Sequence, residues 1–202
     1  MTDALAVDAL KRAEVYLTTA GLIDESGAVL YSGVSALRPG PVYLLGLNPG
    51  GSEGASLRIS IAASMREHNA YLDEQWAPGG HLQPVGQATL QRRVQKLCAR
   101  MGLNTRSVPA SNLVFTRSSR VNKHLGFDEA LKLCLPVHEI FIEAIQPRFL
   151  MTFGSIDNFR KAVSITSIES RLAQHGSWKA HRGTGKLGKH EFAFGNIPHM
   201  SL

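Results

Sequence analysis

Three polar residues have types and positions suited to chemistry: Asn48 in the glycine-rich turn "GLNPGG" (residues 46–51), Asn112, and His199. A glycine-rich turn after an apolar run is typical of loops that bind phosphate. This turn lacks the Gly-x-Gly-x-x-Gly spacing of a dinucleotide site, and Ser52 stands where a nucleotide-binding phosphate loop needs lysine. The alternative is a structural turn in which the Asn48 side chain caps a helix or bonds its own backbone. Taken alone, the turn favours the structural role.

The elements that must position these residues are predicted from apolar runs and helical spacing. The predicted strands are residues 42–47, 111–116, 149–153 and 191–196. The predicted helices are residues 3–19, 56–73, 87–101, 128–145 and 156–162. This alternation predicts an α/β fold, a three-layer α/β/α sandwich around a mostly parallel sheet of about four strands. Because ligands bind beyond the carboxyl ends of such strands, we expect Asn48, Asn112 and His199 to converge.

The length of 202 residues is enough for one compact domain, which we place at residues 1–202, with a helix and loop over 1–40 and the core over 41–202. No run of eighteen apolar residues occurs, and the first residues carry acids instead of a basic leader. We therefore expect a cytoplasmic protein, monomeric and without a membrane contact. Cys98 and Cys134 match neither a zinc spacing nor a disulfide framework, and we expect both to be reduced core residues.

The net charge of +6 is unevenly distributed, because no Asp or Glu occurs between Glu74 and Asp128, or between residues 174 and 190. The first window contains the cations Arg92, Arg93, Lys96, Arg100, Arg106, Arg117, Arg120 and Lys123. The second, which we expect to be a flexible stretch, contains Lys179, Arg182, Lys186 and Lys189. Clustered cations bind phosphates through counterion release, so DNA is the predicted partner, unless these residues are only solvated. Trp178 in the second window is suited to stack on a base.

The order of the motifs resembles the uracil-DNA glycosylase superfamily. Gly-x-Asn-Pro-Gly after the first predicted strand is similar to the first motif of its mismatch-specific and single-strand-selective branches. The middle of the chain, "SNLVFTRSSR" followed by "LKLCLPVHEIFIEAIQPRFLMTFGS", is similar to the bacterial and archaeal iron-sulfur branch. "IPHMSL" stands where the superfamily has its His-Pro-Ser motif. The resemblance covers residues 42–202 and implies removal of uracil or a related damaged base from DNA.

The resemblance implies a role for each matching residue. Asn48 would hold the attacking water, and His199 would stabilise negative charge on O2 of the departing uracil. Asn112 would read the uracil edge, because one amide supplies an acceptor for N3–H and a donor for O4. The residues implied to lie against the base are Gly46, Leu47, Pro49, Gly50 and Ser201. The DNA-binding residues we expect beside them are Arg117, Arg120, Lys123, Lys179, Arg182, Lys186 and Lys189.

Departures from the superfamily pattern keep other functions open. Of the cluster positions of the iron-sulfur branch, only Cys134 is a cysteine and Thr116 replaces another, so we expect no cofactor and no metal. The segment after the first motif lacks the aromatic residue that stacks on uracil, and Tyr71, Trp76 or Phe115 would have to replace it. Met200 also replaces the proline of the last motif. The alternatives are a non-catalytic nucleic-acid or nucleobase-binding relative and a small-molecule hydrolase on the same scaffold.

Two further candidates have structural explanations. His138 with Glu139 and Glu143 has a partial metal-ligand spacing, but we expect the charged side of this helix to be solvated. Ser155 lacks the following glycine that a nucleophile elbow requires.

Overall fold

The computed structural model describes residues 4–51, 54–118, 124, 126–173 and 176–200. Its helices are α1 (Ala4–Thr19), α2 (Leu57–Met65), α3 (Ala70–Asp73), α4 (Thr89–Arg100), α5 (Phe127–Ile145) and α6 (Ile156–Ala162). Its strands are β1 (Val42–Gly46), β2 (Ala110–Asn112), β3 (Phe149–Phe153), β4 (Ser164–Leu172), β5 (Lys179–Leu187) and β6 (His190–Ile197). In this part of the chain, no helix is both long enough and apolar enough to cross a membrane.

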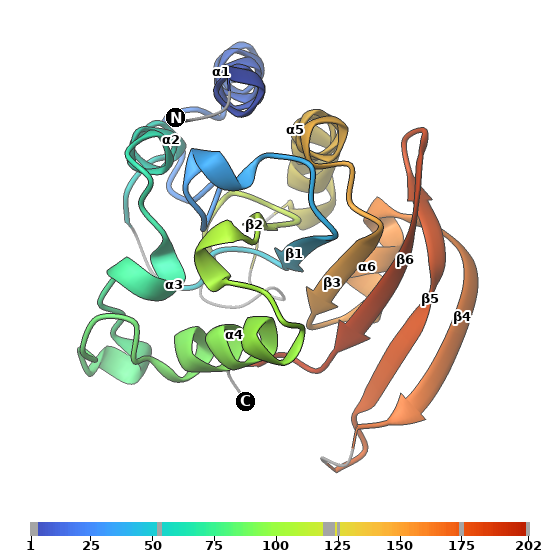
Figure 1. Cartoon of the computed structure of the whole chain (residues 1–202). Coiled ribbons are helices and arrows are strands. Elements are labelled where there is room, and N and C mark those ends of the chain that lie inside the picture. Colours follow the sequence, from blue (N-terminus) through green and yellow to red (C-terminus); the bar gives the residue numbers. More distant parts are fainter. Residues whose placement is uncertain (1–3, 52–53, 119–123, 125, 174–175, 201–202) are drawn as a thin grey trace.

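The α/β class predicted from the sequence is confirmed, but the sheet is mixed and has six strands in the order β2-β1-β3-β6-β5-β4 (Figure 1). The neighbours from β2 to β6 pair in parallel. The pairs β6–β5 and β5–β4 are antiparallel, so the prediction of about four strands was too low. The stretch expected to be flexible over residues 174–190 contains β5, which hydrogen-bonds on both sides to its neighbours.

Helices cover both faces of the parallel half of the sheet, as predicted, because its strands are apolar on both sides. Tyr43 and Leu45 of β1 join the core that also contains buried residues of α1 and α5. Val42 and Leu44, which alternate with them, join a second core that contains Val94 and Cys98 of α4. Figure 1 shows α1 and α5 on one side of the sheet and α4 on the other.

The helix α1 belongs to the same domain as the rest of the chain. Its buried residues are Ala6, Ala9, Leu10, Ala13 and Leu17, a spacing that places them on one stripe. This stripe lies in the core shared with α5 and the sheet.

The predicted helix over residues 56–73 is two helices, because the chain turns between α2 and α3. Glu67 has a positive φ of 63°, and its carboxylate accepts a hydrogen bond from the Ser35 hydroxyl at 2.6 Å. Asn69 then caps α3 through its side chain, which accepts from the Tyr71 N–H. The predicted second strand is also shorter, since β2 ends at Asn112. Beyond Asn112, the chain continues beside β1 through the bond from Leu113 N–H to the Gly46 carbonyl at 3.0 Å.

Candidate functional site

The turn after β1 is packed directly against the end of β2. Gly46 is paired in register with Asn112. A Cβ on Gly46 would lie 2.1 Å from Oδ1 of Asn112 and 3.2 Å from the ring of Phe153. Glycine is therefore required here because the Asn112 amide occupies the space above the backbone. The first residue of the turn and Asn112 are thus in contact, at the carboxyl ends of β1 and β2.

The Asn48 side chain is half-buried and oriented by backbone carbonyls. Its Nδ2 donates to the Pro49 carbonyl at 2.9 Å and to the Ser118 carbonyl at 3.2 Å. Because both partners are acceptors, the amide nitrogen must face them and both N–H groups are used. Among the described residues, Oδ1 has no hydrogen-bond partner. The arrangement leaves the amide oxygen to accept a hydrogen bond from a water or a ligand.

The predicted structural role of this turn is also visible. The segments on either side of it run together, with Val114 N–H donating to the Leu47 carbonyl at 2.9 Å and Ser118 N–H donating to the Pro49 carbonyl at 3.0 Å. Asn48 contributes to this pairing through its bond to Ser118. The side chain thus holds the loop with its nitrogen and leaves its oxygen for another partner.

Asn112 is nearly buried, with 5% of its surface exposed, and it interacts with Tyr31, a residue that sequence reasoning missed. The Asn112 side chain lies close enough to the Tyr31 hydroxyl to influence its titration. Burial raises the pKa of Tyr31 to about 12, while the charge of Arg117 and the Asn112 side chain act in the opposite direction. Tyr31 therefore remains a neutral phenol beside Asn112 at pH 7.

Arg117, predicted to bind DNA, lies against the glycine turn. Its Nη1 donates to the Gly50 carbonyl. A Cβ on Gly54 would lie 3.1 Å from its Nε, so the guanidinium packs closely on the loop backbone. That Nε is buried without a hydrogen-bond partner in the described part of the chain. Arg117 therefore supports the turn and places a positive charge near Tyr31 and Asn112.

His199 reaches the same end of the sheet from the segment after β6. Its ring meets the ring of Phe153 edge-on, with centroids 5.4 Å apart. A Cβ on Gly154 would lie 2.7 Å from Leu47 and 3.6 Å from the His199 ring, so the two side chains approach Gly154 together. Burial lowers the pKa of His199, which keeps the imidazole neutral at pH 7. The predicted convergence of His199 with the turn is thus present, with Phe153 between the elements.

An interaction with α4 holds the segment that carries His199. Nη1 of Arg93 donates to the Met200 carbonyl at 2.7 Å, and Met200 is buried beside α4. The position of His199 therefore depends on α4 as well as on β6. Ser201, the remaining residue implied to contact the base, lies outside the described residues.

The charged side of α5 is exposed at Glu139 and Glu143, as expected, whereas His138 is a core residue. It is fully buried, and its Nε2 donates to the Leu113 carbonyl at 3.1 Å. Its Nδ1 then accepts from the Tyr43 hydroxyl at 3.0 Å. Burial lowers the pKa of His138 to about 4. This neutral imidazole connects β1 to the peptide that follows Asn112, and so supports the position of Asn112 from the core.

Aromatic rings form one wall near Asn112. Tyr31 stacks on Tyr71 with centroids 5.4 Å apart, and Trp76 meets both rings edge-on. Of the three rings proposed to stack on a base, Tyr71 is 2% exposed and Phe115 is fully buried. Tyr31 and Trp76 are partly exposed and lie at the edge of the second core. These two are the accessible rings of this wall.

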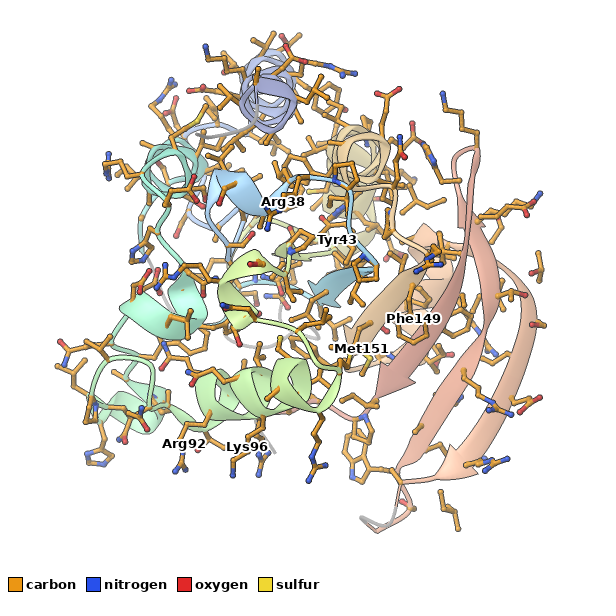
Figure 2. The ribbon with its side chains drawn as sticks, viewed as in Figure 1. Arg38, Tyr43, Arg92, Lys96, Phe149 and Met151 are labelled. Carbon is orange, nitrogen blue, oxygen red and sulfur yellow. The ribbon has the colours of Figure 1, made fainter. Side chains whose placement is uncertain are left out.

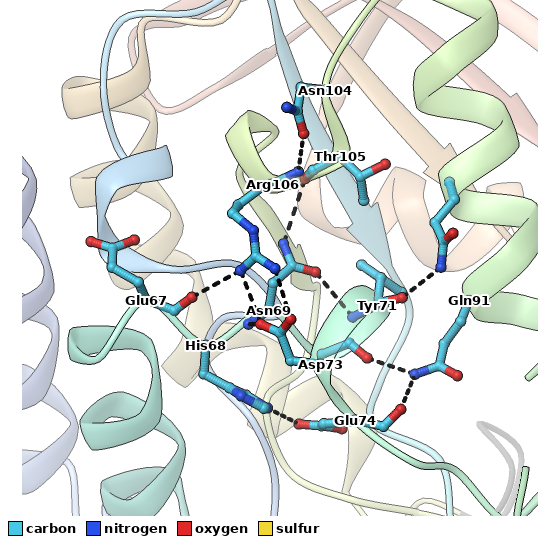
Figure 3. Close-up of polar contacts among 12 residues, drawn as sticks. Glu67, His68, Asn69, Tyr71, Asp73, Glu74, Gln91, Asn104, Thr105 and Arg106 are labelled. Atoms are coloured by element: carbon cyan, nitrogen blue, oxygen red, sulfur yellow. Dashed lines mark hydrogen bonds and ion pairs between the residues drawn. The ribbon is translucent and has the colours of Figure 1, made fainter. Parts of the chain in front are cut away.

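A polar network fixes the wall (Figure 3). Arg106 donates to both carboxylate oxygens of Asp73, at 2.7 and 3.0 Å, and this interaction lowers the pKa of Asp73. Nε2 of Gln91 donates to the carbonyls of Ala70 and Glu74, which ties α3 to α4. The helix α3, which carries Tyr71 of this wall, is therefore held by Arg106 and by Gln91.

The predicted DNA-binding residues do not form a single cluster. Lys179 and Arg182 lie in the half of β5 next to the carboxyl end of β6, whereas Lys186 lies about 23 Å along the strand from Lys179. Arg182 pairs with Glu169 at 2.7 Å, and Lys186 pairs with Glu191 at 2.6 Å. Lys189 lies between β5 and β6, near the same end as Lys186, and Arg120 and Lys123 lie outside the described residues.

A second group of cations lies on α4, on the outer face of the molecule. Figure 2 shows Arg92 and Lys96 projecting away from the sheet. Both are exposed, as is Arg100 one turn further. No ion pair to these residues is present within the described ranges. The helix therefore presents unneutralised positive charge to solvent.

Other predicted features have been located. Cys98 and Cys134 are free thiols and fully buried, as predicted for core residues. Within the described residues, no three His, Cys, Asp or Glu side chains gather as metal ligands do. Ser155 caps α6, with its side chain accepting from Asn158 N–H. A depression of about 520 Å³ lies between α6 and the start of β4, at the opposite end of the sheet from Asn48.

No protein-family model matches the chain, and no curated protein has a similar sequence.

Proposed function

We propose that the chain is a DNA glycosylase of the uracil-DNA glycosylase type, which removes uracil or a related damaged base by water attack on the N-glycosidic bond. The observation that carries this proposal is the geometry of Asn48. Both of its N–H groups are used by backbone carbonyls, and among the described residues its oxygen has no partner, in the turn that follows the carboxyl end of β1.

In the proposed reaction, Oδ1 of Asn48 accepts a hydrogen bond from the attacking water and orients it toward C1′ of the flipped nucleotide. An amide is too weak a base to remove a proton from water, so its role is to position the nucleophile. The bond from C1′ to the base breaks with its electron pair on the base. The water oxygen bonds to C1′, and its proton is released to the departing base or to solvent. This reaction uses no cofactor.

The base would be recognised by Asn112. Its amide, packed over Gly46, would present Oδ1 as an acceptor and an N–H as a donor to the edge of uracil. Cytosine offers the opposite pattern of donor and acceptor at this edge, so an amide held in this orientation selects against it.

His199 would stabilise the leaving group. Burial lowers its pKa, and a neutral imidazole donates one N–H to the negative charge that develops on uracil O2. Its position is fixed by Phe153 and by the contact of the next residue with Arg93.

A test separates the positioning role of Asn48 from its role in the turn. Asn48→Ala should lower the rate of base release by about 10² or more, because the water is no longer held in line with C1′. The assay is incubation with uracil-containing single- and double-stranded oligonucleotides, followed by alkaline cleavage. Asn104→Ala is the matched control, since Asn104 is a structural cap that accepts from the Arg106 N–H at 3.0 Å. This control should lose stability and keep its activity.

The same assay gives the results that would refute the proposal. Normal kinetics for Asn48→Ala would remove the water-positioning role. If the wild-type protein releases no base but binds these oligonucleotides, the second candidate holds, a non-catalytic nucleic-acid-binding protein. The unneutralised cations of α4 favour this second candidate, because they serve phosphate binding whether or not a base is released.

A further inference from the structure

The hairpin formed by β4 and β5 extends beyond the end of the sheet where the candidate site lies. In register, His181 of β5 pairs with Asn196 near the end of β6, and Leu172 pairs with Lys179. Trp178 therefore lies about 10 Å beyond the level of Asn196, at a rise of about 3.3 Å per residue. Figure 1 shows the hairpin continuing past the arrowheads of β3 and β6.

The tip of this hairpin exposes two large apolar side chains. Leu172 is 68% exposed and Trp178 is 45% exposed. The backbone beneath them is ordered by pairing, with Ala173 N–H donating to the Trp178 carbonyl at 2.8 Å. The other tryptophan of the chain, Trp76, packs on Tyr71 and donates to Glu74 at 2.6 Å. An exposed indole on an ordered backbone is a preformed contact surface.

Each apolar side chain at the tip has a cation on its own face of the hairpin. Side chains alternate along strands, so Leu172 and its partner Lys179 share one face. Arg171 and Trp178 then share the other face, since Ala173 opposes Trp178. In the described part of the chain, Arg171 and Lys179 form no ion pair, unlike Arg182, which is paired to Glu169. The tip therefore combines an exposed indole with unpaired positive charge on both faces.

We propose that this hairpin tip binds single-stranded DNA next to the candidate site, with Trp178 stacking on a base and Arg171 and Lys179 contacting phosphates. The proposal rests on the proposed function only for the choice of DNA as partner. Stacking tolerates any base, and phosphate contacts carry no sequence information, so this contact should be independent of sequence.

The charge of the tip argues against a second copy of the chain as the occupant. In a two-fold dimer the same surface meets itself, so Arg171 and Lys179 would face like charges. A strand of DNA supplies the opposite charge and flat rings at once.

The test uses an oligodeoxythymidylate, which contains no uracil and so reports binding without base release. Binding should quench the fluorescence of Trp178. The contribution of Trp178 is the part of the quenching that is lost in Trp178→Phe. Trp178→Ala should weaken binding by roughly 5- to 150-fold, the range for loss of one stacked base, while Trp178→Phe should stay within a few-fold of wild type. Leu82→Ala is the matched control, since Leu82 is 65% exposed in a different loop. It should bind as wild type does.

Salt dependence tests the cations separately. Arg171→Gln and Lys179→Gln should each make the log–log slope of affinity against salt shallower by about 0.7, the value for one phosphate on a single strand. Wild-type affinity in Trp178→Ala, or self-association of the protein that Trp178→Ala abolishes, would overturn the proposal. If oligodeoxythymidylate binding depends on Trp178 but no uracil is released, this inference stands and the glycosylase proposal fails.

Discussion

Gly46→Ala tests the central contact of the candidate site, because the new methyl group must displace the Asn112 amide. An added Cβ would lie 2.1 Å from Asn112 Oδ1, whereas real contacts of this kind are not shorter than 3.0 Å, so the amide has to move by roughly 1 Å. The amide is nearly buried. Local overpacking costs about 1–3 kcal/mol, against a gain of about 0.4–1 kcal/mol from replacing glycine.

We therefore expect Gly46→Ala to lower the free energy of unfolding by about 1–2 kcal/mol, which for a chain of this size lowers Tm by about 2–4 °C per kcal/mol. The measurements are thermal unfolding and urea unfolding at pH 7. Gly50→Ala is the matched control from the same turn, because its Cβ would meet no atom within 4 Å. It should be as stable as wild type or slightly more stable.

The same variant has a functional consequence under the proposed mechanism. A displacement of about 1 Å at a group that orients the substrate can lower a rate by about 10². We expect base release to fall by this order in Gly46→Ala, and Gly50→Ala is used as a control for stability only. Equal unfolding temperatures for wild type and Gly46→Ala would refute the reasoning, because the Asn112 amide could not then be packed over Gly46.

Two further predictions concern buried titratable groups. The pKa of His138 is about 4 in the folded protein and 6.5 in a model peptide, so the unfolded chain binds the proton first. The stability gained by keeping His138 neutral is fully present above pH 6.5 and is lost as the pH falls toward 4, by about 3 kcal/mol in total. Urea unfolding at pH 7 and at pH 4.5 measures this loss. An equal loss of stability in His138→Gln would exclude His138 as its source. Burial also raises the pKa of both thiols, that of Cys134 to about 12, so a thiol reagent at pH 8 should modify neither Cys98 nor Cys134 until denaturant is added; modification of the native protein would contradict their burial.

The parts of the fold with strong apolar periodicity could be predicted from the sequence. The bounds of β3 and α6 are those predicted, and α5 begins one residue earlier than expected. Short apolar runs between turn residues have few alternatives to a buried strand, and a long stripe at helical spacing has few alternatives to a helix. The position of the glycine-rich turn beside Asn112 could also be predicted, since parallel strands end at the same edge of the sheet.

The β4–β5 hairpin could not be predicted, because its sequence is polar and contains glycines. A Cβ on Gly183 would lie 1.9 Å from the Ser167 carbonyl, so the close approach of the two strands requires glycine. Glycine is normally depleted in strands, and an edge hairpin with few buried residues shows little apolar alternation. A polar, glycine-containing sequence predicts a flexible loop, but here the same sequence forms a tightly paired edge hairpin.

Residues that support the site from a distance also escaped prediction. Tyr31 contacts Asn112, and His138 contacts Tyr43, across long separations in the chain. Neither residue stands in a motif, and each has a type that is common in cores. Their roles follow from which groups they bond, and that depends on the packing of several elements together.

The charges around the site bear on which base could leave. The turn and its neighbours carry the cation Arg117 and the neutral imidazole of His199, both suited to a base that departs as an anion. The carboxylate whose charge reaches Tyr31 is Glu74, which already accepts hydrogen bonds from Trp76 and His68. Departure of adenine or guanine is normally assisted by protonation of the ring, for which an acid must be at hand. Uracil leaves as a stabilised anion and needs only hydrogen-bond donors and nearby positive charge. Under the proposed mechanism, the electrostatics of the described residues favour a pyrimidine leaving group over a purine.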